Sequence, residues 1–319
     1  MEVGVERTFL VTGAAGFIGS HSVDLLLASG HAVIGLDNLR TGRLANLEQA
    51  LRSGRFTFVE GDAADEATVD AVFAGRRIDG VLHLAALVSV PESFREPALN
   101  FRTNVAATDV VARACLRHGC PRVVFASSAA VYGDRAELPN RESAVPQPMS
   151  PYAAAKLASE ELLLGYAASY GLQAVCFRYF NVYGVRQDPG SPYSGVLSIF
   201  TDRFAAGLPV TVYGDGEQTR DFVSVHDVAR ANATALIAEA AGSGRFNVCT
   251  GVAVSLNRVL DVYRRLYPSS AGVAYAEARV GDIRHSCGDA GALAKRFDVR
   301  ARVEIEAGLG ALVRGESLS

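Results

Sequence analysis

Short apolar runs alternate with amphipathic stretches through the first half of the chain. The runs are apolar on both faces and rich in β-branched or aromatic residues, which is typical of strands buried in a parallel sheet. Strands that alternate with helices imply right-handed βαβ units, so the pattern predicts a doubly wound, Rossmann-type α/β fold. The predicted strands are 9–11, 32–36, 56–59, 80–84, 123–126 and 173–178, and the predicted helices are 17–29, 65–74, 97–118 and 150–168.

The regular alternation ends near residue 181. The stretch 187–194 contains two prolines, a glycine and two serines, which indicates a loop or a domain junction. Shorter strands and helices follow less regularly. We expect a larger α/β domain over 1–180 and a smaller α/β lobe over 181–319, with part of 222–250 returning to the main sheet.

Composition narrows the class of protein. With 49% hydrophobic and 20% charged residues, the 319-residue chain is predicted to be globular. A net charge of −3 gives no electrostatic support to nonspecific nucleic-acid binding. The five cysteines show no metal-ligand spacing, so we expect reduced thiols, no metal site and a cytoplasmic location. The sequence predicts no signal peptide and no membrane span.

Three glycines, Gly13, Gly16 and Gly19, lie between the first predicted strand and the first predicted helix. Glycines there let backbone N–H groups approach a pyrophosphate at the positive end of the helix. The spacing GxxGxxG is weak evidence alone, and its position between strand and helix strengthens it. Asp37 ends the second strand, where a carboxylate would bind ribose hydroxyls and repel a 2′-phosphate, which favours NAD. A solvated strand-end Asp is the alternative, and Arg40 leaves NADP open.

Two more strand ends carry residues that such a cofactor would pass. Gly61 and Asp62 follow the third strand, where Asp62 could touch the adenine. His83, Leu84, Ala85 and Ala86 follow the fourth, and His83 by itself is more typical of a core histidine.

Tyr152 and Lys156 lie four residues apart on one face of the helix predicted at 150–168. Lys156 is one of two lysines in a chain with 29 arginines, so a compact ammonium at this position is unusual here. A tyrosine that acts as a base near neutral pH needs its pKa lowered by about 3 units, about 4 kcal/mol. A cation about 4 Å away can supply most of that. Alternatively, the two residues belong to an ordinary helix surface.

Together these features resemble the extended short-chain dehydrogenase/reductase family, in its NAD-dependent nucleotide-sugar epimerase/dehydratase branch. The resemblance covers nearly the whole chain, and the ordered set of motifs carries it. The motifs are TGAAGFIG (12–19), Asp37-Asn38, Gly61-Asp62, HLAA (83–86), Asn104, Ser127-Ser128, VYG (131–133), YAAAK (152–156), RYFNVYG (178–184), GDGEQTRDF (214–222) and RVGDIRHS (279–286).

The resemblance implies a role for each matching position. Tyr152 corresponds to the catalytic base, Lys156 to the group that lowers its pKa and holds the nicotinamide ribose, and Ser128 to the hydroxyl that relays the sugar proton. Arg220 and Arg279 resemble diphosphate clamps. The implied cofactor-binding set is Gly13, Gly16, Phe17, Ile18, Gly19, Asp37, Asn38, Asp62, Ala63, Leu84, Ala85, Ala86, Asn104, Tyr152, Lys156 and Phe180. The implied substrate-binding set is Ser128, Asn181, Val196, Tyr213, Arg220, Arg279, Asp282 and Ser286.

The two residues after Ser128 narrow the expected reaction. Members of this branch begin by oxidising the sugar at C4, and a dehydratase then needs an acid and a base beside the serine. Ala129 and Ala130 occupy those positions, which favours return of the hydride and hence a UDP-hexose 4-epimerase. A dehydratase with an unusual acid/base set stays open, and so, less well supported, does a non-catalytic NAD-binding regulator.

Two finer expectations also come from the resemblance. Ser286 matches a position that limits the room near C2 of the sugar, so both plain and N-acetylated hexoses are expected; it could also be a small packing residue. Asn181 departs from the Thr of some UDP-glucuronate epimerases. The helices at 97–118 and 150–168 are expected to form a four-helix bundle in a homodimer, although their apolar stripes, with Val105, Val111 and Leu116, could instead pack on the sheet.

Overall fold

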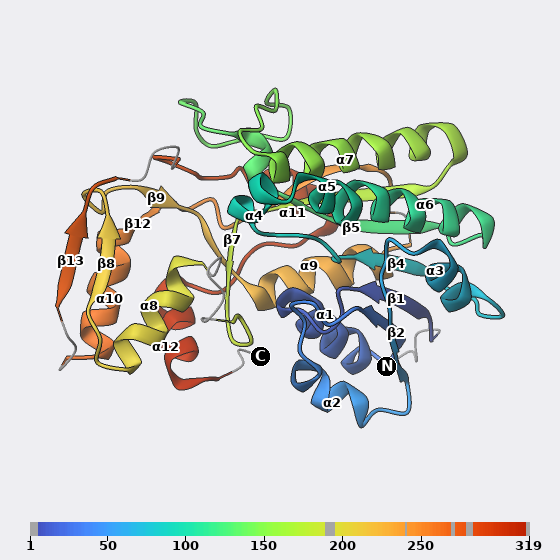
Figure 1. Ribbon diagram of the computed structural model, residues 1–319, viewed down its shortest axis with the longest axis horizontal. Coiled ribbons are helices and arrows are strands. Elements are labelled where there is room, and N and C mark those ends of the chain that lie inside the picture. Colours follow the sequence, from blue (N-terminus) through green and yellow to red (C-terminus); the bar gives the residue numbers. More distant parts are fainter. Residues whose placement is uncertain (1–5, 189–194, 240, 269–271, 279–282, 317–319) are drawn as a thin grey trace.

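The computed structural model describes residues 6–188, 195–239, 241–268, 272–278 and 283–316. Its centre is a seven-stranded parallel sheet in the order β11-β6-β5-β4-β1-β2-β3 (Figure 1). The predicted parallel sheet and Rossmann-type fold are confirmed. The strands are β1 (Thr8–Thr12), β2 (Ala32–Asp37), β3 (Phe56–Glu60), β4 (Gly80–His83), β5 (Arg122–Ser128), β6 (Gln173–Tyr179) and β11 (Gly244–Val248).

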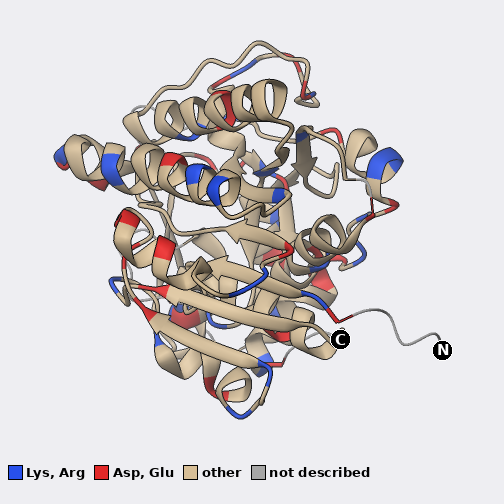
Figure 2. Cartoon of the chain, turned by 90° about the vertical axis from the view of Figure 1, so that its right-hand side faces the viewer, with Lys and Arg blue, Asp and Glu red and all other residues tan. Residues whose placement is uncertain are grey.

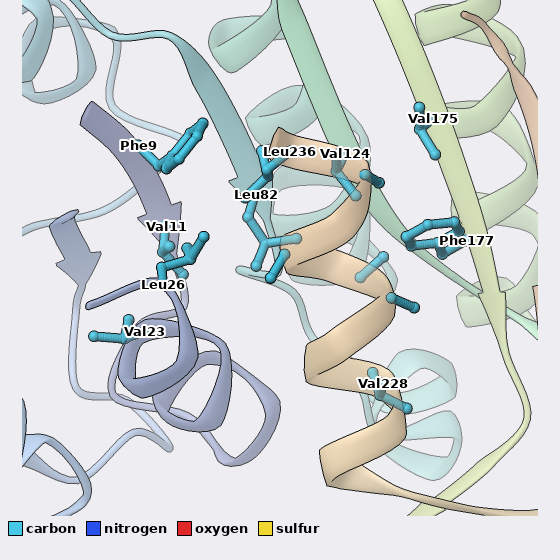
Figure 3. Packing of buried hydrophobic residues seen from close by; sticks show 14 of the residues in the cluster. Phe9, Val11, Val23, Leu26, Leu82, Val124, Val175, Phe177, Val228 and Leu236 are labelled. Atoms are coloured by element: carbon cyan, nitrogen blue, oxygen red, sulfur yellow. The ribbon is translucent and has the colours of Figure 1, made fainter. Parts of the chain in front are cut away.

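Helices cover both faces of the sheet. On one face α1 (Phe17–Ala28) packs against α9 (Val225–Ile237), as Figure 3 shows, with α11 (Gly291–Phe297) beside α9. On the other face α3 (Glu66–Phe73), α6 (Ala107–Arg117) and α7 (Pro151–Tyr170) pack together. Each layer encloses its own apolar core, because the buried strands present hydrophobic side chains to both faces. Figure 3 shows Val11, Leu82, Val124 and Phe177 from the strands facing α1 and α9.

Helix α7 begins and ends where its sequence predicts. Ser150 caps the N-terminus, since its side chain accepts a hydrogen bond from Ala153 N at 3.1 Å, and Pro151 takes the first helical position. Gly171, in the left-handed region at φ +74°, ends the helix. These signals place Tyr152 in the first turn.

The helix predicted at 97–118 is interrupted. It consists of α5 (Pro97–Asn100), a π-helical segment η2 (Phe101–Ala106) and α6. Short π-helical segments are frequent at functional sites, because the extra residue in the turn shifts the side chains that follow it. Asn104 lies in this segment.

A smaller lobe lies beside the sheet, at the left of Figure 1. Its core joins Tyr183, three helices and a strand pair. Strands β8 (Val210–Tyr213) and β13 (Val273–Ala276) pair in parallel, and β9 (Thr219–Arg220) pairs with β12 (Val254–Ser255). Strand β7 (Asn181–Tyr183) pairs with β10 (Phe222–Ser224) where the chain passes between the two parts. The helices of the lobe are α8 (Val196–Ala205), α10 (Leu256–Leu266) and α12 (Ile305–Arg314).

Within the segment 222–250, α9 covers the sheet and β11 forms its edge beside β6. Two helices, α2 (Glu48–Leu51) and α4 (Val90–Arg95), and two 3-10 turns, η1 (Leu44–Leu47) and η3 (Ala129–Tyr132), complete the main domain. Charges of both signs are interspersed over the face seen in Figure 2. Among the described residues no helix is long and apolar enough to cross a membrane.

Candidate active site

The strand order reverses between β1 and β4, and the carboxyl ends of the strands at such a point are where doubly wound sheets bind ligands. The glycine turn lies there. Gly13 has φ +70°, and a Cβ on it would lie 2.8 Å from Ala85 N; a Cβ on Gly19 would lie 2.0 Å from Gly13 O. The N-terminus of α1 has no side-chain cap, so its first N–H groups face outward for an anion. This cradle of bare backbone fits a dinucleotide pyrophosphate.

Asp37 closes the crevice on the β2 side. It is 8% exposed, and its carboxylate accepts hydrogen bonds from Ala15 N at 2.9 Å and Leu39 N at 2.8 Å. Burial raises the pKa of Asp37, while these backbone donors lower it. The side chain of Asn38 accepts from Arg40 N, and the Arg40 guanidinium pairs with Glu92 at 2.5 Å. Arg40 is therefore engaged with α4, and among the described residues no ion pair joins Asp37 to a cationic side chain.

Asp62 and Asn104 hold the loops that border the crevice. Asp62 accepts from Ala64 N at 2.9 Å and from the Arg102 guanidinium at 2.7 Å. The amide of Asn104 donates to Leu87 O at 3.0 Å and accepts from Leu87 N at 3.1 Å, so it fixes the segment after β4. Any effect of Asn104 on a cofactor would act largely through that segment.

Tyr152, Ser128 and Lys156 come together where α7 crosses the end of β5. The Tyr152 backbone N donates to Ser93 Oγ at 3.1 Å, which anchors the start of α7 to α4. The Ser128 side chain interacts with the Tyr152 hydroxyl and lowers its pKa, and Ser128 Oγ accepts from Ala130 N at 3.2 Å. The predicted catalytic trio is therefore assembled by tertiary contact.

Lys156 is 2% exposed, and its Nζ donates to Ala126 O at 2.8 Å. Its Nζ lies 4.9 Å from the centroid of the Phe125 ring and 5.9 Å from that of Tyr152. Burial lowers the pKa of Lys156 to about 7, while the Glu160 carboxylate raises it. Burial raises the pKa of Tyr152, and the hydrogen bond with Ser128 lowers it. Burial and Ser128 are what shift the pKa of Tyr152 in this structure, and the role of Lys156 in lowering it stays a prediction.

His83 is fully buried and stacks on Phe125. Its Nδ1 lies 2.8 Å from Thr12 Oγ1, and burial lowers its pKa to about 3, so the ring is neutral. This agrees with a core histidine.

Two of the predicted substrate residues, Arg220 and Ser286, lie at β9. Thr219 O accepts from Arg220 Nη1 at 2.8 Å and from Ser286 N at 3.1 Å, which places the arginine and the serine at one strand. Tyr213 ends β8 and is 38% exposed, and Val196 begins α8. Arg279 and Asp282 lie outside the described residues.

The segment 284–289 runs from this strand to Phe180 and Asn140 of the main domain. A Cβ on Gly288 would lie 2.6 Å from the Phe180 ring, and Cys287 O accepts from Asn140 N at 2.8 Å. Asp221, fully buried, accepts from the backbone N of Thr250, Gly251 and Gly288 and fixes this crossing. Asn181 donates through its backbone N to Asp221 O at 3.0 Å. Ser286 and Arg220 therefore lie on segments that are joined through Asp221 and Gly288 to those of Phe180 and Asn181.

Sequence reasoning missed a buried group behind the trio, namely Glu160 with Ser127 and Arg178. Its signal was available: Glu160 follows Lys156 by four residues and Tyr152 by eight, which repeats the same helix face. Among the described residues no cluster of His, Cys, Asp or Glu is arranged to hold a metal ion.

Comparison with known proteins places this site in a family. Residues 9–249 match the model of the NAD dependent epimerase/dehydratase family. The chain is 41% identical over 285 residues to the UDP-glucose 4-epimerase of Mycolicibacterium smegmatis, which covers 87% of this chain and 88% of the relative. Three solved structures are similar over 97% of this chain and 98% of theirs.

The first is UDP-glucose 4-epimerase from Thermotoga maritima with UDP-glucose, at TM-score 0.91 and 36% identity. The second is UDP-N-acetylglucosamine 4-epimerase from Methanobrevibacter ruminantium in complex with UDP-N-acetylmuramic acid, at TM-score 0.92 and 36% identity. The third is the NAD complex of UDP-glucose 4-epimerase from Thermus thermophilus, at TM-score 0.88 and 38% identity. With the glycine cradle, the buried Lys156 and the Tyr152–Ser128 contact, these likenesses show that the chain belongs to the NAD-dependent epimerase/dehydratase family.

Proposed function

We propose that this protein is an NAD-dependent UDP-hexose 4-epimerase that interconverts UDP-glucose with UDP-galactose and UDP-GlcNAc with UDP-GalNAc. The observation that carries the proposal is the pair of alanines after Ser128. Ala129 and Ala130 form the start of η3 directly beside the Tyr152–Ser128 contact. Two methyl groups can neither donate nor remove a proton, so a 4-keto sugar beside them has no local route to elimination.

The cofactor-binding residues fit NAD: the cradle at Gly13 and Gly19 would hold the pyrophosphate, and Asp37 would bind the adenine ribose. Asn38, Asp62, Ala63, Leu84, Ala85 and Ala86 would border it, with Phe180 near the nicotinamide. The chemistry that NAD supplies when bound is removal of a hydride from C4 of the sugar and its return.

The remaining chemistry belongs to side chains of the chain. Tyr152 would remove the proton of the sugar 4-hydroxyl and later give it back, with Ser128 hydrogen-bonded to both groups. Lys156 would stabilise the phenolate as its nearest cation. The burial that raises the pKa of Tyr152 makes this cation necessary, because a buried phenolate is otherwise costly.

The smaller lobe would hold the nucleoside diphosphate. Arg220 would bind phosphate oxygens, and Arg279 would provide the second clamp. Tyr213 and Val196 would contact the nucleoside, with Asn181 and Asp282 near the diphosphate and the sugar. Tight binding of this part leaves the hexose weakly held, so that the ketone can turn before the hydride returns.

Purified protein should convert UDP-glucose and UDP-GlcNAc to their C4 epimers, followed by NMR without added NAD. Absence of a C4-inverted product from a panel of UDP-sugars would exclude an epimerase. A 4-keto or unsaturated product would instead identify a dehydratase. No turnover in a protein that retains NAD would favour a regulator.

The assembly we propose is a homodimer through the helices at 97–118 and 150–168. Val111 is fully buried and Leu116 packs against the core between the helices and the sheet, so these two side chains pack within one protomer. Phe101 and Tyr170 on the same helices are 60% and 66% exposed, which supports a partner surface there. Light scattering should give twice the 33.7 kDa chain mass. Five buried free thiols support a reducing, cytoplasmic location.

A further inference from the structure

Glu160 is a carboxylate buried behind the catalytic trio. It lies on α7 one turn after Lys156 and two turns after Tyr152, so one helix face carries all three side chains. Its side chain is fully buried. A buried carboxylate is costly unless it is paired and hydrogen-bonded, so its contacts define what it does.

Four hydrogen bonds converge on Glu160. Oε1 accepts from Ser127 Oγ and, at 2.9 Å, from Arg178 Nε. Oε2 accepts from Arg178 Nη2 at 2.7 Å and from Arg245 Nε at 3.0 Å. The donors lie on β5, β6 and β11, which are neighbours in the sheet, and Ser127 is the register partner of Arg178. We call Ser127, Glu160, Arg178 and Arg245 the Glu160 cluster.

This cluster is one of two ties between α7 and the end of β5. Lys156 Nζ donates to Ala126 O, and Ser127 Oγ donates to Glu160. Ala126 and Ser127 are consecutive on β5, and they are bound by Lys156 and Glu160, which lie one turn apart on α7. Ser128 follows Ser127 on the strand, and Tyr152 lies one turn before Lys156 on the helix. The distance between these two hydroxyls therefore depends on both ties.

The cluster also supports the segment that follows Ser128. The Arg178 guanidinium lies 4.8 Å from the centroid of the Tyr132 ring, at the end of η3. The Tyr132 hydroxyl donates to Asn247 Oδ1 at 2.6 Å, which ties η3 to β11. Ser128 is consequently held from the strand before it and from the turn after it.

We propose that Glu160 is a positioning residue for proton transfer, which holds Ser128 beside the Tyr152 hydroxyl through Ser127 and Arg178. The inference rests on the proposed epimerase function, because it assigns Glu160 no chemistry of its own. Glu160 also places a negative charge one turn from Lys156 and so favours the ammonium form.

Few titratable groups surround Lys156. Within α7 they are Tyr152 and Glu160, and from β4 the neutral His83 faces it. Behind Glu160 lie Arg178, Arg245 and, on β6, Cys176, whose pKa burial raises. Glu161 accepts from Arg245 at 2.5 Å on the outer side. Glu160 is thus the carboxylate that balances two guanidinium groups behind the ammonium.

The first test is Ser127→Ala, which removes one tie and leaves Glu160 paired with both arginines. We expect kcat for UDP-glucose to fall about tenfold, because a small misplacement of reacting groups is enough for that loss. KM and bound NAD should not change, since Ser127 is buried and its hydroxyl is engaged by Glu160. The matched control is Ser22→Ala, which removes a fully buried serine that bonds Ile18 O and Asn232 on the opposite face. Its kcat should stay at the wild-type value.

The second test is Glu160→Gln with a pH profile of kcat. Loss of the carboxylate lowers the pKa of Lys156 further, so the ammonium is lost at lower pH and the alkaline limb moves toward neutral pH. A purely structural role would reduce activity equally at every pH. If this variant does not fold, Ser127→Ala still decides the question.

The outcomes separate the two proposals. If the wild-type protein yields no epimer, the proposed function fails whatever the variants do. If the wild-type protein does yield the epimer, the kcat of folded Ser127→Ala decides. A kcat at the wild-type value, or reduced no more than in Ser22→Ala, would show that the positioning role of Glu160 is wrong. A tenfold loss confined to kcat in Ser127→Ala supports it.

Discussion

At the scale of single residues, burial decides what the catalytic pair can do. The sequence spacing put Tyr152 and Lys156 on one helix face, and the structure adds that Lys156 is 2% exposed and directed at Ala126 O. Burial alone makes the ammonium and the phenolate both costly. The pair works only if further charges compensate, and Glu160 is the nearest carboxylate that does so.

Tyr152→Phe should abolish turnover and keep NAD bound. The change removes one hydroxyl, and loss of a general acid/base costs about 10²–10⁴-fold in rate. The measurement is epimer formation by NMR together with NAD content after denaturation. Turnover at the wild-type rate would show that Tyr152 is not the base.

Ser286→Tyr should reduce turnover of UDP-GlcNAc more than that of UDP-glucose. The backbone of Ser286 is held at Thr219 O, so a larger side chain has little freedom to move away from the sugar. We expect the ratio of kcat/KM values to change by at least about tenfold, within the range that steric selection achieves. The control is Ser286→Ala, which should preserve both activities. An equal loss on both substrates for Ser286→Tyr would refute a gate at this position.

At the scale of elements, the site depends on where helices begin. Helix α7 starts at a capped Ser150-Pro151, and its first turn delivers Tyr152 to the end of β5. The π-helical segment η2 turns Asn104 toward the loop after β4. The cap of α7 and the π-helical segment are both local features. Each one nevertheless brings together residues that are far apart in the chain, Tyr152 with the end of β5 and Asn104 with the loop after β4.

Ser150→Ala should lower the free energy of unfolding by about 1 kcal/mol, because it removes an N-cap. Urea unfolding followed by circular dichroism measures this change. The control is Ser29→Ala, at the C-terminal end of α1, where the hydroxyl makes an exposed bond to Leu25 O. An equal effect of the two substitutions would contradict the capping role.

At the scale of the molecule, several interactions cross from the cofactor domain to the smaller lobe. One of them is His21 on α1, whose Nε2 lies 3.0 Å from Val185 O and whose ring contacts that of His226 edge to face. Burial lowers the pKa of His21 to about 4, against a backbone hydrogen bond that raises it. The neutral ring is therefore part of the folded state.

Stability should fall as the pH drops from 6.5 toward 4. Over this range the unfolded chain protonates His21 and the folded chain does not, so protons favour unfolding. The loss at pH 5 relative to pH 7 is about 2 kcal/mol for a shift of this size. His21→Gln, which keeps a donor for Val185 O, should flatten this dependence in urea unfolding measured at both pH values. An unchanged slope would show that His21 does not contribute.

The sequence determined the fold class, most element positions and the members of the candidate trio, Ser128, Tyr152 and Lys156. Local sequence patterns predict buried strands, a glycine turn and helix caps, because these features depend on near neighbours in the chain. The same is true of Tyr152 and Lys156, which one helix turn brings together. Their roles, and those of the other candidate residues, stay predictions.

Only the tertiary structure decided which polar groups are buried and what they pair with. The helix at 97–118 is broken by η2, Val111 faces the core, and the amide of Asn104 is engaged by Leu87. The carboxylate of Glu160 meets donors from three strands. Such contacts join residues up to 85 positions apart, so no local pattern encodes them, and the environment they create sets the protonation of Lys156.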